Sequence, residues 1–260
     1  MPKNREHLVA GRPTSGRHIR IATQNIQWGG DPAPGGDGHP RLTRLMPYLA
    51  RLDADILVLT EHKSGGRGDE LADLLEETGY PYLLHRTPRS PSLGTAIASR
   101  LPLTQIDLPI PSVIDSWRSL AVRVADIEVI GFYFPLGEAK AHYWDWVLAN
   151  AAELLPRNTI LIGDFNTGNH GIDEIGRTFY SSEKHAALED LGFIDTWRAA
   201  NPAGREYTWY SSAGNGFRLD YIWASPLLAA RVTSIRHDHE ARLAGATDHT
   251  AVIAEVMLSI

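Results

Sequence analysis

Hydrophobic positions along the chain follow two periods, and these predict a domain in which strands and helices alternate. Apolar runs of strand length cover residues 19–25, 55–61 and 159–164. Between the first two runs, residues 41–52 repeat apolar side chains with the 3.6-residue period of an amphipathic helix. A second helix is expected over residues 69–77, where the sequence returns to a helical pattern.

Short strands separated by frequent turns fill the middle of the sequence, and helices return later. We expect further strands at 94–99, 120–124, 127–134, 218–224, 251–258 and near Tyr207, and further helices at 138–155 and 183–190. Strands outnumber helices, and helices fall between strands in both halves of the chain. This order suits an α/β fold in which helices pack on both outer faces of a two-sheet sandwich.

The composition supports a sizeable core and excludes sulfur chemistry. The chain has 260 residues, of which 43% are hydrophobic and 22% charged, and it contains no cysteine. Disulfides, zinc–thiolate sites and a cysteine nucleophile are therefore excluded, and any metal must be bound by oxygen or imidazole. The sequence has no tandem repeat and no linker, so we expect a single domain over residues 19–260.

The charge is unevenly spread along the chain. The net charge is -6, but the first twenty residues hold five basic residues and one acidic residue, which leaves about -10 on the remainder. We expect residues 1–18 to form a flexible basic arm. The acidic body argues against non-specific binding of nucleic acid. It does not exclude a nuclease, because a cluster of acidic residues becomes an electropositive site when it binds metal ions.

The sequence predicts no membrane anchor. It contains no run of roughly 18 apolar residues, and its first residues lack the apolar segment of a signal peptide. We therefore expect a cytoplasmic, monomeric protein with no membrane partner.

Polar residues stand where the predicted apolar strands end. The set consists of Asn25, Glu61, Tyr133, Asp164, Asn166 and Asp220, together with the pair Asp248 and His249 just before the last strand. Because residues at strand ends can converge at one rim of a sheet fold, we expect these groups to form one site. Carboxylate and amide oxygens favour magnesium, with manganese as the alternative.

Eight short segments carry a family resemblance. They are 23–25 (TQN), 59–63 (LTEHK), 94–100 (GTAIASR), 133–138 (YFPLGE), 163–166 (GDFN), 207–209 (YTW), 218–222 (RLDYI) and 247–249 (TDH). In this order they resemble the endonuclease/exonuclease/phosphatase superfamily, and most of all the exonuclease III-type apurinic endonucleases. The resemblance implies a four-layer α/β sandwich with the active site at one edge.

The resemblance also implies a role for each residue of the set. Glu61 would be the principal magnesium ligand, helped by Asn25 and Asp248. Asp164 would align or deprotonate the attacking water, and Asn166 would orient the water or the phosphate. His249 would contact a phosphate oxygen while Asp220 holds its other ring nitrogen, and Tyr133 would lie near the scissile phosphate.

Some positions depart from the family pattern, and others have structural alternatives. The family often has Asp or Asn at the position of Gln27, and many nucleases have Asn or Gln at the position of Leu136. Tyr133 could instead be a core residue. We expect Tyr143, Trp144 and Trp146 to pack in the core, and His170 and His185 to lie on the surface. Trp117 and Arg118 could hold a phosphate.

Three functions remain open at this level. The first is a magnesium-dependent DNA endonuclease or exonuclease, with a place in DNA repair. The second is a phosphatase or phosphodiesterase for a small-molecule or lipid phosphate ester, which the acidic body, Gln27 and Leu136 favour. The third is a non-catalytic binding protein that kept the fold.

Overall fold

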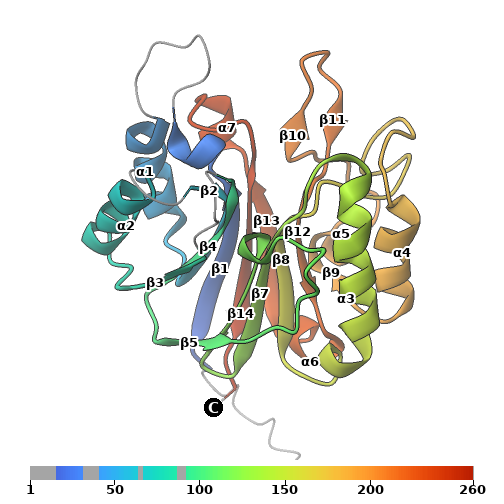
Figure 1. Ribbon diagram of the computed structural model, residues 1–260, viewed down its shortest axis with the longest axis horizontal. Coiled ribbons are helices and arrows are strands. Elements are labelled where there is room, and N and C mark those ends of the chain that lie inside the picture. The colour runs from blue at the N-terminus through green and yellow to red at the C-terminus, as the bar shows by residue number, and fades with distance from the viewer. Residues whose placement is uncertain (1–15, 32–40, 64–66, 87–91, 260) are drawn as a thin grey trace, which may run out of the picture.

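Two six-stranded sheets stacked face to face form the centre of the molecule (Figure 1). The computed structural model describes residues 16–31, 41–63, 67–86 and 92–259. The first sheet has the order β13 (Val232–Asp238), β14 (Ala251–Met257), β1 (His18–Asn25), β2 (Ile56–His62), β4 (Gly94–Ser99) and β3 (Tyr82–His85). The second has the order β5 (Leu103–Ile106), β6 (Ser119–Val124), β7 (Ile127–Tyr133), β8 (Thr159–Asp164), β12 (Asp220–Ala224) and β9 (Ile194–Asp195). A separate hairpin pairs β10 (Trp209–Tyr210) with β11 (Gly216–Phe217).

Helices cover the outer face of each sheet, which gives the predicted four-layer α/β sandwich (Figure 1). The longer helices are α1 (Arg41–Leu52), α2 (Arg67–Glu77), α3 (Ala141–Leu154) and α4 (Ser182–Asp190). The short ones are α5 (Thr196–Ala200), α6 (Pro226–Ala229), α7 (Glu240–Leu243) and the 3-10 turns η1 (Trp28–Gly30), η2 (Ser116–Arg118) and η3 (Gly137–Lys140). Helices α1 and α2 lie on the first sheet, and α3 and α4 on the second (Figure 1).

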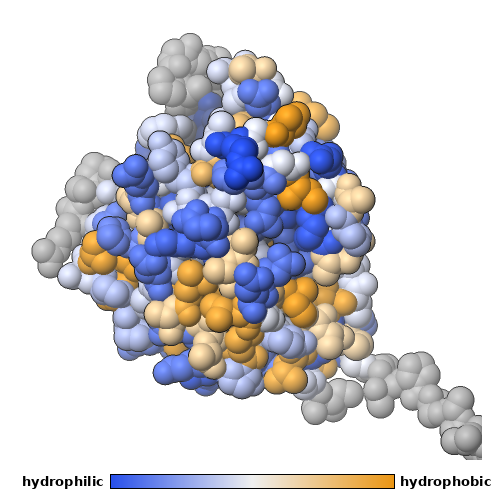
Figure 2. Space-filling view, turned by 90° about the vertical axis from the view of Figure 1, so that its right-hand side faces the viewer, coloured by the Kyte–Doolittle hydropathy of each residue, from blue (hydrophilic) through white to orange (hydrophobic). Residues whose placement is uncertain are grey.

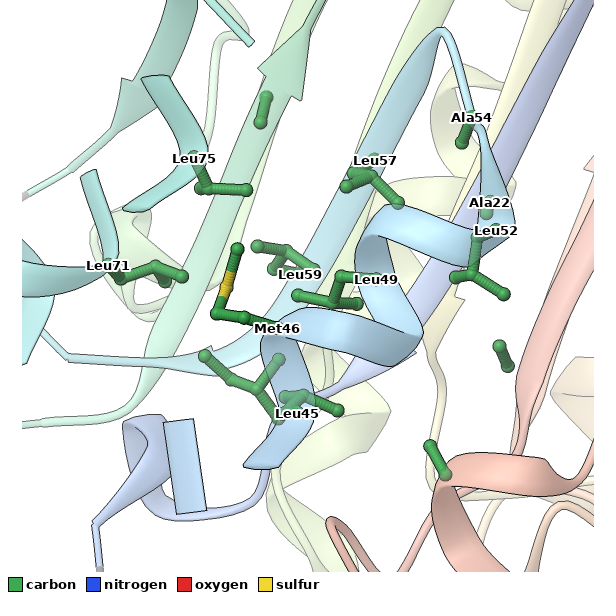
Figure 3. Close-up of a cluster of buried hydrophobic side chains, with 14 of the residues drawn as sticks. Ala22, Leu45, Met46, Leu49, Leu52, Ala54, Leu57, Leu59, Leu71 and Leu75 are labelled. Atoms are coloured by element: carbon green, nitrogen blue, oxygen red, sulfur yellow. The ribbon is translucent and has the colours of Figure 1, made fainter. Parts of the chain in front are cut away.

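The alternation of side chains along β2 explains the layers. Successive strand residues point to opposite faces, so a strand that is buried on both faces reads as one continuous apolar run. Ile56 and Val58 enter the core between the two sheets. Leu57 and Leu59 enter the core beneath α1 and α2, where they meet Leu49 and its neighbours (Figure 3). The uninterrupted apolar segment 55–61 therefore corresponds to a central strand.

The predicted elements are largely confirmed, with shifts at their ends. The helix at 41–52 and the strands at 94–99 and 159–164 have the predicted bounds. The helix expected over 138–155 begins as η3 and becomes α-helical at Ala141. Strand β13 was not predicted, because as an edge strand it is largely exposed and lacks an apolar run. Residues 1–15 of the expected arm lie outside the described residues, and His18 already belongs to β1.

The aromatic prediction is confirmed, and one histidine prediction is wrong. Tyr143, Trp144 and Trp146 are buried in the core beneath α3. His185 was expected on the surface but is fully buried, with its ring 5.1 Å from the ring of Trp223. Helix α4 turns this residue inward against α3 and β12, and burial lowers the pKa of His185 to about 4. His170 is partly exposed, as expected.

The outer surface mixes polar and apolar side chains. The face that carries α3 and α4 has hydrophilic residues over its upper part and several hydrophobic ones lower down (Figure 2). Among the helices that the structure describes, none is long and apolar enough to cross a membrane.

Candidate active site

The strand topology brings the predicted residues to one rim of the sandwich. Strands β1 and β2 are parallel, as are β7 and β8, so each pair ends at the same edge of its sheet. Strands β14 and β12 run antiparallel to β1 and β8 and therefore begin at that edge. In the register, Asp164 lies opposite both Tyr133 and Asp220. This rim is at the top of Figure 1, between α7 and the β10–β11 hairpin.

Asn25 links the two sheets at this rim. Its side-chain amide donates to Glu61 Oε1 at 3.1 Å and to Asp164 Oδ2 at 3.0 Å. The side-chain oxygen of Asn25 accepts a hydrogen bond from the backbone N–H of Gln27 at 2.9 Å. Thr247 Oγ1 donates to the backbone oxygen of Asn25 at 2.7 Å, which holds the segment before β14 in place. An amide between two carboxylates reduces their repulsion and fixes their separation.

Glu61 is held in an unusual backbone conformation. Its φ is 61°, and the register of β2 against β4 shifts between Thr60 and His62. A non-glycine residue in the left-handed region costs about 1–3 kcal/mol and persists only where its surroundings over-determine it. The second carboxylate oxygen of Glu61 accepts from the backbone of Trp28 at 2.7 Å. The bulge therefore turns the carboxylate toward the rim and leaves it partly exposed there.

Asp164 is buried among other acidic groups. Its Oδ1 accepts from the backbone of Asn166 at 2.9 Å. Burial raises the pKa of Asp164 to about 7; Asp220 adds to this, while His249 opposes it. Carboxylates with a raised pKa of this kind are typical of acid–base sites.

Asn166 is fixed on both its backbone and its side chain. Its φ is 52°, and its side-chain amide donates to the backbone oxygen of Phe134 at 2.8 Å. The backbone oxygen of Asn166 accepts a hydrogen bond from Lys140 Nζ. Lys140 is buried, and burial lowers its pKa to about 8 although Asp164 opposes the shift. This lysine was not predicted from the sequence, because a lysine at a helix start is ordinarily solvated.

His249 and Asp220 form a buried ion pair. His249 Nδ1 lies 2.8 Å from Asp220 Oδ2. Burial alone would lower the pKa of His249, but Asp220, Asp164 and Asp248 outweigh it and raise the pKa to about 10. The ring is therefore an imidazolium at neutral pH, with Asp220 fixing its orientation.

Tyr133 lies against the same groups and beneath an arginine. Only 8% of Tyr133 is exposed, and burial followed by the charges of Glu61 and Asp164 raises its pKa. The guanidinium of Arg118 sits over the Tyr133 ring at 4.6 Å from its centre. Arg118 therefore lies beside a predicted site residue. The prediction that Trp117 and Arg118 hold a phosphate requires such a position.

These residues open into one cavity of about 220 Å³. Its lining consists of Glu61, Tyr133, Leu136, Asp164, Asn166, Trp209, Leu219, Asp248 and His249. Trp209 Nε1 donates to Asp248 Oδ2 at 3.1 Å. Leu136 is 75% exposed at the mouth, so one wall of the cavity is apolar. Asn25 and Asp220 support the lining from behind it, and all eight predicted residues belong to this one cluster.

The donor set suits a divalent cation that prefers oxygen ligands. Asp248 Oδ1 is buried and has no hydrogen-bond partner within the described part of the chain, so its lone pairs remain available. Glu61 lines the same cavity. Asp164, Asp220 and His249 also gather within 4.8 Å of one another, but the protonated His249 ring has no lone pair to offer an ion and pairs with Asp220 instead. Uncompensated buried carboxylates are costly, and a cation would offset that cost.

Comparison with known proteins agrees with this arrangement. The sequence profile of the endonuclease/exonuclease/phosphatase family matches residues 22–249. The chain belongs to this family. The family resemblance inferred from the eight segments is therefore confirmed.

Solved structures from this family superpose on nearly the whole chain. An AP endonuclease from Archaeoglobus fulgidus has a TM-score of 0.74 and 25% identity, with 93% of this chain and 100% of that chain covered. A 3′-5′ exonuclease from Neisseria meningitidis has a TM-score of 0.73 and 26% identity, covering 92% and 100%. A 3′ phosphatase from Neisseria, bound to a product DNA hairpin, has a TM-score of 0.73 and 25% identity, again covering 92% and 100%. As a member of the endonuclease/exonuclease/phosphatase family, the protein is a phosphate-ester hydrolase.

Proposed function

We propose that the protein is a magnesium-dependent DNA endonuclease or exonuclease. The observation that carries the proposal is the convergence of acidic, amide and imidazole groups on one cavity at the rim. The names of two structural relatives support DNA as the substrate: an AP endonuclease, and a Neisseria enzyme described both as a 3′-5′ exonuclease and as a 3′ phosphatase bound to product DNA. A role in DNA repair follows from the same similarity.

Glu61, Asn25 and Asp248 would hold the metal ion. When bound, magnesium or manganese neutralises charge that develops on the phosphate oxygens. The side-chain oxygen of Asn25 accepts one hydrogen bond from the backbone of Gln27 and keeps a second lone pair, which would be its ligand to the ion. Its amide nitrogen stays on Glu61 and Asp164.

Asp164 and Asn166 would position the attacking water. Asp164 has one oxygen fixed by the Asn166 backbone and the other by Asn25, so the carboxylate is held rigidly. With its pKa raised to about 7, Asp164 accepts the proton that water loses on attack. Asn166 orients the water or the phosphate.

His249 and Tyr133 would act on the phosphate. The His249 imidazolium has its Nδ1 proton committed to Asp220, so its Nε2–H donates to a phosphate oxygen. The Tyr133 hydroxyl lies near the scissile phosphate and stays protonated at neutral pH, because burial raises its pKa. Together these donors stabilise the additional charge of the transition state.

The organisation of the chain fits the expected single catalytic domain over residues 19–260, to which β1 adds His18, preceded by a basic segment. We further propose a monomer that works in the cytoplasm.

A second candidate is a phosphatase or phosphodiesterase for a small or lipid phosphate ester. Leu136 favours it, because an exposed apolar residue stands at the mouth of the cavity where a polar DNA contact is common in the family. The acidic body also weakens the electrostatic attraction to DNA.

The decisive experiment is magnesium-dependent cleavage of a labelled duplex that carries one abasic site. The wild-type protein should cut it, and Asp164→Asn and Glu61→Ala should each lower the rate by about 10²- to 10⁴-fold. Chelation should abolish cleavage, and Leu243→Ala at an exposed position of α7 is the matched control. An intact duplex, together with metal-dependent phosphate release from a small ester, would move the assignment to the second candidate.

A further inference from the structure

A second group of metal-binding side chains lies outside the catalytic cavity. Glu206 precedes β10, His237 is near the end of β13, and His239 immediately precedes α7. Glu206 Oε2 lies 3.1 Å from His237 Nδ1 and 3.4 Å from His239 Nε2. One ligand atom from each residue lies within 4.8 Å of the other two. We propose that Glu206, His237 and His239 form a binding site for a transition-metal ion such as Zn²⁺.

The spacing of the three atoms suits a shared ion. Zinc binds His nitrogen and carboxylate oxygen at about 2.0–2.2 Å, so neighbouring ligands of a tetrahedral site lie about 3.4 Å apart. The two measured separations from Glu206 are close to that value. The separation between His239 and Glu206 is also long for a direct hydrogen bond.

Both rings are held in the orientation that the site requires. His237 stacks on Trp197 with ring centres 4.6 Å apart and planes at 5°. His239 Nδ1 lies 3.0 Å from Thr250 Oγ1, which accepts from Arg242 Nε at 2.9 Å. In the tautomer that carries its proton on Nδ1, His239 donates to Thr250 Oγ1 and its Nε2 lone pair faces Glu206. A partner of this kind on the remote ring nitrogen is characteristic of metal-bound histidine.

Two arginines near the site act against a positive charge at His237, and ion pairs weaken their effect. Arg198 and Arg218 lie over Trp197, each with its guanidinium 5.1 Å from the ring centre. Both arginines bond to Asp173 Oδ1, at 2.8 and 2.7 Å, and Arg218 also pairs with Asp195. The Glu206 carboxylate is the group of the site that would have to offset the remaining repulsion.

The donor chemistry selects the class of metal. Two imidazoles and one carboxylate suit zinc, cobalt or nickel, whereas magnesium demands oxygen ligands. The chain has no cysteine, so no thiolate competes for the ion. Glu206 has 52% of its side chain exposed and His239 has 32%, so an ion can enter from solvent.

Such an ion would brace the wall of the catalytic cavity. Thr208 is two residues after Glu206, and its backbone oxygen accepts a hydrogen bond from the backbone N–H of Thr250 at 2.8 Å. These two segments continue into Trp209 and His249, which both line the cavity. The ion would therefore hold Glu206, in the segment that leads to Trp209, against His239, which contacts Thr250 beside His249.

The test measures zinc retention by the full-length protein after chelation and reloading, in excess magnesium. Wild type should keep zinc at this site, and His239→Ala and Glu206→Gln should each lose one equivalent. His170→Ala is the matched control, because His170 also bonds a glutamate but has no second histidine beside it. Loading with Co²⁺ should give the visible absorption of tetrahedral coordination in the wild type and the control only.

Melting provides a second, independent readout. Zinc at 100 times its dissociation constant should raise the melting temperature of the wild type by about 5 °C or more, and that of Glu206→Gln by much less. Glu206→Gln changes one exposed atom, so its fold is retained. Equal zinc retention by wild type and both variants, or no retention by wild type, would overturn the proposal. Neither readout uses substrate, so the result is independent of the proposed DNA activity.

Discussion

Asp220 and His249 depend on each other because both are buried. Without a partner, the buried His249 ring would lose its proton, and without His249 the Asp220 carboxylate would be an uncompensated charge. Their 2.8 Å contact raises the pKa of His249 and so keeps the ring protonated at neutral pH. The charge state of the His249 ring is thus set by a residue that does not line the cavity.

The variant Asp220→Asn tests this dependence. An amide cannot stabilise the imidazolium as a carboxylate does, so the pKa of His249 should fall from about 10 to below 7. Hydrolysis at neutral pH should fall by about 10- to 100-fold, as for other losses of an orienting partner. NMR titration of the His249 ring measures the pKa directly. A ring that still titrates near pH 10 in the variant would show that Asp164 and Asp248 are sufficient.

Lys140 offers a prediction about pH and stability. Burial lowers its pKa from 10.5 to about 8 in the folded protein. Between these values the unfolded chain binds a proton that the folded protein does not, so the free energy of unfolding rises with pH across this window. Lys140→Met should lack that rise. Urea unfolding of metal-free wild type and variant between pH 7.5 and 10.5 gives the difference, and equal slopes would contradict the prediction.

At the scale of elements, the sequence predicted the helices and strands whose apolar side chains are buried in a regular pattern. Helix α1 is predictable because its apolar residues, Leu42 to Leu52, all face one layer. Strand β13 is not, because its contacts are backbone hydrogen bonds to β14 and its side chains are mostly exposed. Lys140 and His185 were missed because a local pattern does not reveal which long-range contacts bury a polar side chain.

Leu49 tests the layer beneath α1. It is fully buried and packs on the outward face of β2 (Figure 3). Leu49→Ala should lower the free energy of unfolding by about 2–5 kcal/mol, because it removes buried methyl groups and leaves a cavity. Leu243→Ala, where the side chain is 75% exposed, should change it by less than about 0.5 kcal/mol. A loss below about 1 kcal/mol at Leu49, measured by urea unfolding, would indicate that the helix layer relaxes into the space.

At the scale of the whole molecule, the site exists only because two sheets meet at one rim. Asn25 and Asp164 are 139 positions apart in sequence and 3.0 Å apart in space. The motifs predicted which side chains gather at the rim, since each stands at one end of an apolar strand or just before it. They did not predict that an amide would stand between the two carboxylates, because that contact depends on how one sheet is placed on the other.

Buried histidines make the stability of the whole fold sensitive to acid. His185 lies in the core between α3, α4 and β12, and burial lowers its pKa from 6.5 to about 4. As the pH falls from 6.5 to 4, the unfolded chain gains a proton there and the folded protein does not, so stability is lost. At about 1.4 kcal/mol per pKa unit, this one ring accounts for up to roughly 3 kcal/mol.

The variant His185→Gln should therefore have a flatter stability profile between pH 6.5 and 4, whatever its stability at neutral pH. His142→Gln, at an exposed position of α3, should follow the wild-type profile. Urea unfolding of the chelated proteins at half-unit pH steps measures all three curves. If His185→Gln kept the wild-type slope, the acid sensitivity would have to come from His62 and His237, whose pKa values burial also lowers, or from carboxylates that lose their ion pairs in this pH range.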